Sequence, residues 1–410
     1  MAKKRDIEGK RLYHFELSDK NRTVRWVLIV LLLIVAVVSI SLGVSNALKK
    51  NAGWQQIDPV AHNRNCSHEF VLSYDLGAGE ASATAEYKAL ASLYGQATAD
   101  AWQIFYSEAD TIEGINGMNA LNKQPNQELS VAPELYQAFE KLENNHSRAL
   151  YFGPAYSNYD QVFFSTNDFE AEYSDPVTNP DVMDYLIQVA AYANDPESIN
   201  LELRGDNRVF LKVSAEYSAF LEENGASVIV DFGWLRNAFV IDYLAQKITE
   251  AGFTNGFLSS LDGFTANFDR RGTSYNLDIF QSGKGVATMT YQGAANLMVL
   301  RSYSMYYGDE YRYYTYADGR TVAPYVDLRD GVSKTATDQL VTYSTEYGCA
   351  ELAMAMLPIY AADTLDEAQL LELSNSKIHS IWFTDMQLNY TQSDLLLKIF
   401  DTSVVPKKAQ

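Results

Sequence analysis

Apolar side chains recur every three or four residues in several long stretches of the chain. This spacing places them on one face of a helix. The longest stretch is Ala85–Ile115, where Leu90, Ala91 and Tyr94 follow the spacing. The same pattern predicts further helices near Glu134–Asn144, Asp181–Tyr192, Ala238–Ala251 and Tyr347–Ala361, and a short one near Glu367.

Other stretches alternate apolar and polar residues, which is the pattern of a half-buried strand. They predict strands at Asn200–Leu203, Val209–Val213, Phe257–Leu261, Ser274–Phe280, Val286–Tyr291, Leu297–Tyr303 and Ser380–Phe383. Ser227–Asp231 is a short apolar run and predicts a buried strand. Because helices come first and a mixture of strands and helices follows, the pattern favours one large domain of the α+β class.

One stretch fits neither pattern. The residues from Trp26 to Leu48 carry no charge, and most of them are apolar. About 20 such residues cross the hydrocarbon core of a bilayer as a helix. We therefore expect a basic tail at 1–25, a transmembrane helix at 26–48, a polar stalk at 49–70, a folded domain at 71–400 and a short tail at 401–410.

Charge is distributed unevenly along the chain. The 410 residues carry a formal net charge of −20, yet residues 1–50 hold 10 Lys and Arg against 4 Asp and Glu. Basic residues flank the cytosolic side of membrane helices. We therefore expect a single-pass protein of the cell membrane, with a cytoplasmic N-terminus and an extracytoplasmic main domain. The alternative is a cleaved signal peptide ending near Ser45-Asn46-Ala47. The acidic body argues against a nucleic-acid partner.

Two segments offer candidate binding chemistry. Asp231–Asp242 reads as a strand end, a turn with Gly233 and the start of a helix, and helix N-termini bind anions through their free amides. The tyrosine-rich run Tyr303–Tyr316 either offers aromatic faces to a sugar or a flavin, or packs at a sheet edge. Neither a phosphate-binding G-x-x-x-x-G-K-[ST] loop nor G-x-G-x-x-G occurs in the chain.

The first of these segments resembles the signature of the ApbE-like family, the FAD:protein FMN transferases, which is roughly D-x-G-x-x-A-K-G-Y-x-x-D. Asp231, Gly233 and Asp242 match in register, and Phe239 keeps an aromatic residue at the Tyr position. The likeness extends over about residues 70–362. The other segments that follow the family's order are Leu76–Ala78, Phe105–Asn116, Gly252–Gly263 and Gly348–Ala355.

This resemblance implies a T-fold-related α+β domain that binds FAD and uses Mg²⁺. Members of the family transfer FMN from FAD to a Thr of a partner protein and release AMP. The resemblance thus implies a flavoprotein or membrane redox partner beside the membrane itself. By the same resemblance, the cofactor-binding positions are Asp231, Gly233, Asn237, Asp242 and Gly263.

Departures from the family pattern bear on catalysis. The signature Lys is Asn237, and the first Gly of the family's Gly-Gly loop is Asp262. The Asp and Thr that hold the metal fall on Ala350 and Met354, and neither side chain offers the hard oxygen that Mg²⁺ prefers. The family's His-containing segment falls near Tyr313–Gly319, which has no His. No catalytic residue and no metal ligand is therefore expected.

The sequence leads to one main hypothesis and two alternatives. The main hypothesis is a membrane-anchored, non-catalytic relative of the FMN transferases that binds a flavin or a protein. The first alternative is an active Mg²⁺-dependent transferase that attaches FMN to a Thr of its partner. The second is a structural or docking domain that binds no flavin.

Overall fold

The computed structural model describes residues 49–62, 64–79, 81–109, 116–305, 312–384, 386–392 and 395–409. From Ala52 onward the chain forms one compact unit. The expected transmembrane helix at 26–48 lies outside the described residues. Within the described ranges, no helix is both long and apolar enough to cross a bilayer.

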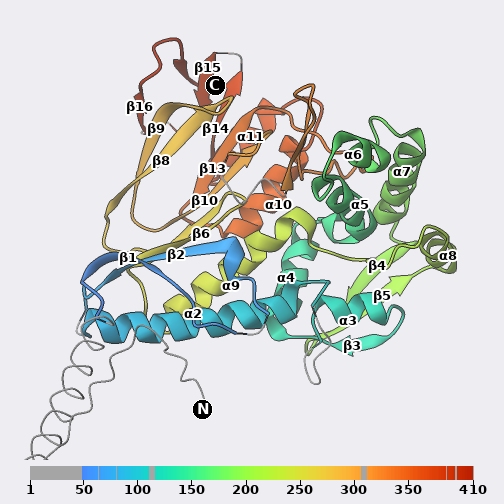
Figure 1. Ribbon diagram of the computed structural model, residues 1–410, viewed down its shortest axis with the longest axis horizontal. Helices are drawn as coiled ribbons and strands as arrows, with labels where there is room; N and C mark the ends of the chain where they lie inside the picture. The colour runs from blue at the N-terminus through green and yellow to red at the C-terminus, as the bar shows by residue number, and fades with distance from the viewer. Residues whose placement is uncertain are drawn as a thin grey trace, which may run out of the picture. The chain divides into compact units, whose positions relative to one another are not determined.

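The α-helices of this unit are α2 (Ala83–Phe105), α3 (Met118–Lys123), α4 (Pro133–Asn144), α5 (Gly153–Phe163), α6 (Asp168–Ser174), α7 (Pro180–Asn194), α8 (Ala215–Glu223), α9 (Arg236–Glu250), α10 (Cys349–Tyr360) and α11 (Glu367–Asn375). Helices α2, α4, α7, α9, α10 and α11 lie close to where the three-to-four-residue spacing predicts them, whereas α3, α5, α6 and α8 were not predicted (Figure 1). Short 3₁₀ turns are η1 (Ser67–Glu69), η2 (Ala149–Phe152) and η3 (Gly233–Leu235). Helix α2 is shorter than predicted and ends at Phe105. Residues 110–115 of that prediction lie outside the described residues.

A nine-stranded sheet runs through the unit, and its neighbours are antiparallel except for the last pair. Its order is β1 (Gly53–Ile57), β2 (Phe70–Leu76), β6 (Gly256–Ser260), β7 (Phe264–Asn267), β10 (Ala295–Arg301), β13 (Gln339–Ser344), β14 (His379–Thr384), β15 (Gln387–Tyr390) and β17 (Val405–Lys408). Smaller sheets pair β16 (Leu396–Ile399), β9 (Lys284–Gln292) and β8 (Ser274–Gln281), then β3 (Glu128–Ser130), β5 (Arg208–Val213) and β4 (Ile199–Leu203), and finally β11 (Tyr314–Thr315) with β12 (Thr321–Val322).

The middle strands of the nine-stranded sheet, β10, β13 and β14, are buried on both faces. Helices α2, α9 and α10 pack on one face, where Met298 and Trp382 join the main core. On the other face, Leu297, Val341 and Ile381 join a second core with residues of β8 and β9. Adjacent residues of β10 thus point into different cores, because successive side chains of a strand point to opposite faces.

Two predicted boundaries are wrong. The segment 49–70, expected to be a stalk, contains β1, which pairs with β2 from Gly53 to Ile57. The tail 401–410 contains β17, which pairs with β15 from Val405 to Lys408. Both are edge strands that bury few side chains, so they leave no alternating apolar pattern in the sequence.

The predicted strand at Ser227–Asp231 is also wrong. This segment is extended and partly buried but belongs to no sheet. A side-chain amide takes the role of a neighbouring strand. The Asn122 Oδ1 accepts from the backbone N–H groups of Ile229 and Val230 at 2.8 and 2.9 Å, and its Nδ2 donates to the Val230 carbonyl at 2.9 Å.

Candidate functional site

A cavity of about 880 Å³ opens between helix α5, the end of α2 and the first turn of α9. Aromatic rings form much of its wall. They belong to Trp102, Tyr156, Tyr159, Phe163, Phe164 and Trp234. The charged residues that line it are of both signs, four acidic and three basic. They are Glu69, Glu108, Lys123, Asp160, Asp231, Arg236 and Arg312.

A buried polar network lies at one end of the cavity and centres on Glu69, the last residue of η1. The Tyr106 hydroxyl donates to Glu69 Oε1 at 2.8 Å, and the Asn237 Nδ2 donates to Oε2 at 2.9 Å. The Arg312 guanidinium pairs with the same Oε2 and also donates to Asp262 Oδ2 at 3.0 Å. We call these five residues the Glu69 network.

The network keeps the Glu69 carboxylate charged in a buried place. Burial alone would raise its pKa, but the charges of Arg312 and Arg236 and the hydrogen bonds from Asn237 and Tyr106 outweigh burial and lower the pKa to about 2. The fold thus supplies its own anion at this end of the cavity, already surrounded by donors.

Arg236, in the first turn of α9, is the second cation beside this network. Its guanidinium lies over the Tyr106 ring, 4.1 Å from the centroid, and within 4.0 Å of Glu69 Oε1. Its NH1 donates to Glu108 Oε1 at 3.4 Å. Arg236 and Arg312 therefore both face carboxylates of the protein itself.

Asp231 and Gly233, two of the predicted cofactor-binding residues, lie in the cavity wall. The Asp231 Oδ1 accepts from the Gly233 N–H at 2.6 Å, and Oδ2 accepts from the Ser107 hydroxyl at 2.5 Å. The Gly233 N–H is one of the backbone amides expected to bind an anion, and it is thus already hydrogen-bonded to the Asp231 carboxylate. Gly233 has φ +53°, and a Cβ there would lie 2.4 Å from the Tyr156 ring. This glycine makes room for a side chain of the protein itself.

Three carboxylates of the cavity lining, those of Glu108, Asp160 and Asp231, influence one another. The wall around Asp160 desolvates its carboxyl and, with the nearby charges of Asp231 and Glu108 opposing Arg236, raises the pKa to about 6. The side chain still reaches the open space of the cavity. Burial likewise raises the pKa of Asp231. This part of the cavity therefore disfavours additional negative charge.

Asn237 and Asp242 are not in the cavity lining. Asn237 is buried and donates to Glu69, as described above. Asp242, further along α9, instead caps the N-terminus of α10. Its Oδ1 accepts from the Cys349 N–H at 2.8 Å and its Oδ2 from the Ala350 N–H at 3.0 Å. Asp242 therefore fixes one helix against another, a role that a helix N-terminus offers to any carboxylate.

Gly263 is also a backbone feature and lies outside the cavity lining. It turns the chain between β6 and β7 with φ +109°, and a Cβ there would lie 2.3 Å from the Val299 carbonyl oxygen on β10. Its neighbour Asp262 belongs to the Glu69 network. The glycine thus lets the β6–β7 turn approach β10 closely.

Substitution of Gly263 by alanine is expected to lower the free energy of unfolding by roughly 2–5 kcal/mol, because left-handed backbone strain adds to a steric clash. Gly252→Ala is the matched control, since Gly252 has φ +90° but no atom within 4 Å of its Cβ position. Urea denaturation of both variants measures the difference. Equal losses for the two variants would show that the approach to Val299 is unimportant.

The two positions where the family holds its metal lie in helix α10. Ala350 is fully buried and Met354 is 7% exposed, and neither lines the cavity. Among the described residues, no group of three or more His, Cys, Asp or Glu is arranged to hold a metal ion.

The aromatic residues singled out in the sequence mostly serve packing. Phe232 and Phe239 lie in the core, with ring centroids 4.7 Å apart. The Tyr314 hydroxyl donates to Asp168 at 2.9 Å, and the Tyr316 hydroxyl donates to Asp175 at 2.7 Å. These contacts attach the tyrosine-rich run to helix α6 and the turn after it. Residues 306–311 of the run lie outside the described residues.

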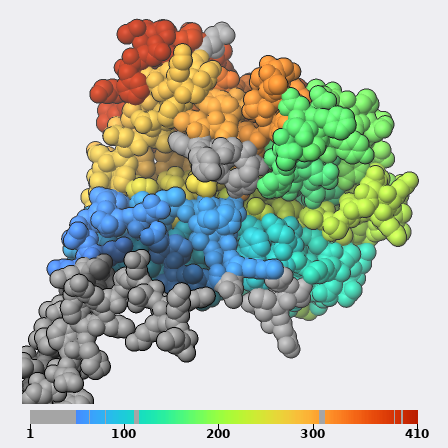
Figure 2. Space-filling view, in the orientation of Figure 1, coloured from blue at the N-terminus to red at the C-terminus, as the bar shows by residue number. Residues whose placement is uncertain are grey.

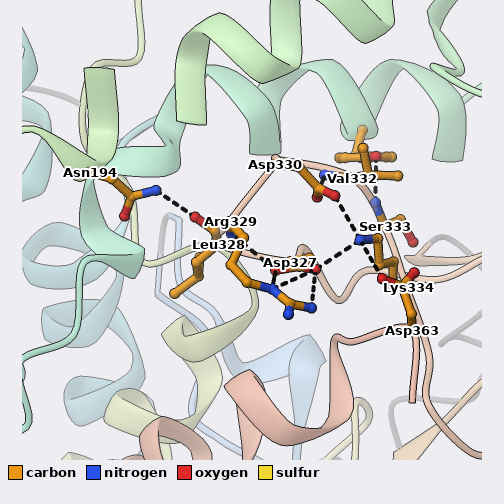
Figure 3. A network of polar contacts seen from close by, with 10 residues as sticks. Asn194, Asp327, Leu328, Arg329, Asp330, Val332, Ser333, Lys334 and Asp363 are labelled. Atoms are coloured by element: carbon orange, nitrogen blue, oxygen red, sulfur yellow. Dashed lines mark hydrogen bonds and ion pairs between the residues drawn. The ribbon is translucent and has the colours of Figure 1, made fainter. Parts of the chain in front are cut away.

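A second polar network holds the aromatic wall in place (Figure 3). Lys334 Nζ donates to carboxylates of Asp327, Asp330 and Asp363 at 2.9, 2.6 and 3.3 Å. Beside it, the Ser333 N–H donates to the hydroxyl of Tyr159, a cavity residue of α5, at 2.6 Å. The loop 327–334 is thereby fixed to the helix that carries three of the wall rings.

Sequence reasoning missed most of the site. Glu69, Tyr106 and Arg312 are far apart along the chain, and no spacing links them. The wall helix α5 was also not predicted, although Pro154 near its start is a common helix-initiating signal. Arg236 and Asp160 have no distinguishing sequence pattern at all.

The described unit is thus an α+β domain with a cavity between helices that pack beside a nine-stranded sheet. No protein-family model matches the chain, and no curated protein matches it. Among solved structures, the chain is similar to the ApbE protein from Thermotoga maritima, with 12% identity and a TM-score of 0.53 over 85% of this chain and 97% of that one. It is also similar to the flavin transferase ApbE from Vibrio cholerae, with 11% identity and a TM-score of 0.51 over 86% and 99% of the two chains. These similarities confirm the predicted α+β, ApbE-like fold.

Proposed function

We propose that this protein is a non-catalytic flavin-binding module whose cavity accepts the ring system of a flavin. The observation that carries the proposal is the pairing of an aromatic-walled cavity with the Glu69 network, which ties up cationic and amide donors beside it. The similarity to a flavin transferase supports a flavin as the ligand.

The cavity wall suits a flat, polar-edged ring. Trp102, Tyr156 and Phe164 offer faces for offset stacking, which aromatic pairs prefer. Within the described part of the chain, the buried Trp102 Nε1 and Asn119 Oδ1 have no hydrogen-bond partner. One is a donor and the other an acceptor, and the polar edge of a flavin ring carries both kinds of group.

The same residues do not fit the diphosphate of FAD or a catalytic Mg²⁺. Asn237 stands at the signature lysine position and donates to Glu69, while Arg236 and Arg312 pair with carboxylates. Transfer of a phosphoryl-linked group needs positive charge at the developing negative charge. Because the carboxylates here take up that positive charge, we assign no transferase step to the cavity.

A titration of the full-length protein with riboflavin, followed by flavin fluorescence, tests the proposal. Phe164→Ala is expected to weaken binding roughly 2- to 10-fold, because one stacking face is lost. Phe169→Ala is the matched control, since Phe169 is 82% exposed and does not line the cavity. Saturable binding that is unchanged in Phe164→Ala would contradict the assignment of flavin binding to this cavity. Equal weakening of binding in both variants would contradict it too.

Two further outcomes separate the alternatives. Mg²⁺-dependent release of AMP from FAD, with FMN found on a candidate acceptor by mass spectrometry, would favour the active transferase. Absence of binding by any flavin would favour a structural or docking domain.

The proposal includes a membrane anchor at 26–48, with the domain outside the cell and a redox protein of the membrane as its partner. A Val60→Cys variant is expected to react with an impermeant maleimide in intact cells, whereas Lys10→Cys is not. The native Cys66 and Cys349 are buried and leave a low background. Labelling at position 10 without labelling at position 60 would contradict the proposed topology.

A further inference from the structure

A second groove adjoins the cavity. It has a volume of about 550 Å³ and lies between α5, the start of α7 and the loop 224–228. Ser157, Ser227 and Val228 line both spaces, so the groove and the cavity are neighbours.

The groove belongs to an unusually acidic part of the surface. Residues 153–194 contain no Lys or Arg, and their acidic residues are Asp160, Asp168, Glu170, Glu172, Asp175, Asp181 and Asp184. Asp175 is neutralised by Arg320 at 2.6 Å. Within the described part of the chain, Glu172, Asp181 and Asp184 form no ion pair, and all three are exposed.

Exposed aromatic rings accompany these charges. Tyr173 lines the groove and is 76% exposed, and Phe169 lies one helical turn earlier in α6. Tyr185 of α7 also lines the groove. Figure 2 shows residues 153–194, in green, over a broad part of the visible surface. Rings beside carboxylates suit a cation that carries apolar carbon, because the ring face and the carboxylate both attract the positive charge.

Side-chain amides provide the polar part of the groove. The Asn158 Nδ2 donates to the Ser174 carbonyl at 2.8 Å, and the Gln161 Oε1 accepts from the Ser174 hydroxyl at 3.2 Å. The other polar atom of each amide, Asn158 Oδ1 and Gln161 Nε2, forms no hydrogen bond with a described residue. Amides of this kind suit the N–H and C=O groups of an extended peptide backbone.

The geometry points to a docking groove for an extended segment of a partner protein that is rich in Lys or Arg and apolar residues. Charge complementarity carries this choice of occupant, since Asp181 in the groove lining and the nearby Glu172 and Asp184 are exposed carboxylates without an ion pair among the described residues, and residues 153–194 contain no Lys or Arg. The inference does not need the cavity to hold a flavin, and it extends the proposed function by assigning the groove a separate protein ligand.

Fluorescence anisotropy of the full-length protein with a labelled ten-residue peptide of alternating Lys and Val tests this inference. We expect saturable binding that weakens with salt, and no binding of the peptide in which Glu replaces Lys. Tyr173→Ala is expected to weaken binding about two- to five-fold, since a cation–π contact is lost. Asp181→Asn is expected to weaken it about five-fold, the effect of one charge contact in water.

Two controls separate the groove from general attraction to an acidic protein and from the flavin site. Glu140→Gln removes an exposed charge of α4, outside the groove lining, and Phe164→Ala alters the cavity wall. Neither is expected to change peptide affinity. A loss with Glu140→Gln equal to that with Asp181→Asn, or equal binding of the Glu peptide, would overturn the inference. The riboflavin titration is expected to be unchanged in Tyr173→Ala, so failure of one proposal is distinguishable from failure of the other.

Discussion

Replacement of Arg312 by methionine is expected to lower the free energy of unfolding by about 3–5 kcal/mol, the usual cost of breaking a buried ion pair. Arg312 is 8% exposed and pairs with Glu69 and Asp262, which are 4% and 3% exposed. Its removal would leave two buried carboxylates without their main cation. Chemical denaturation of the full-length protein measures the loss.

The control for this substitution is Arg208→Met, since Arg208 pairs with Glu128 on the surface, where ion pairs contribute about 0–1 kcal/mol. A double variant, Glu69→Gln with Arg312→Met, is expected to be less destabilised than the sum of the single changes, because one of the two uncompensated carboxylates, that of Glu69, is no longer charged. Strict additivity would show that the two side chains do not act as a pair.

The pH dependence of stability follows from the same network. Glu69 has a pKa lowered to about 2 by Arg312, Arg236 and its hydrogen bonds, against the opposing effect of burial. Glu69 is therefore protonated at a lower pH in the folded protein than in the unfolded chain. The contribution of Glu69 is fully present above about pH 5 and is lost as the pH falls toward 2. Glu69→Gln is expected to remove this part of the acid dependence.

Riboflavin is expected to bind about five-fold or more tightly than FAD at pH 7.5, because one unfavourable charge contact has about this effect in water. The relevant carboxylates are Glu108, Asp160 and Asp231 in the cavity. Asp160→Asn is expected to reduce the difference in affinity between riboflavin and FAD, because it raises the affinity for FAD alone. Asp206→Asn, an exposed position outside the cavity lining, is the control.

The pH adds an independent test of this discrimination. Burial and neighbouring carboxylates raise the pKa of Asp160 to about 6. Below that pH the side chain is neutral, so FAD affinity is expected to rise as the pH falls from 7.5 to 5, while riboflavin affinity changes little. FAD is preferable to FMN here because a phosphomonoester itself titrates near pH 6. Tighter binding of FAD than of riboflavin at pH 7.5 would contradict the charge assignment.

Local patterns predicted the elements that bury one face. Helix α9 has the three-to-four-residue spacing because one side of it packs on β6 and β7. Strand β13 escaped prediction because all six of its residues are buried, so apolar and polar positions do not alternate. Ser227–Asp231 looked like a strand because it is apolar, yet Asn122 satisfies its backbone in place of a neighbouring strand.

The site was less predictable for a different reason. The sequence singles out Asp231 and Gly233 because they lie within one short motif, and both line the cavity. The Glu69 network joins residues from η1, the end of α2, α9, the β6–β7 turn and the segment before β11, so no local window contains it. The same separation hid the role of Asp242, which matches the signature but caps a helix, and that of Gly263, which matches the family's Gly-Gly loop but allows two strands to approach.

The two-faced burial of the middle strands of the nine-stranded sheet restricts how this protein can change over evolution. One inserted residue in β10 would exchange Leu297 and Met298 between the two cores and do the same to every residue after it. Substitutions of similar size are tolerable there, but insertions and deletions are not. Length variation among related sequences is therefore expected in the turns, such as Ser282–Gly283 between β8 and β9, and not within β10, β13 or β14.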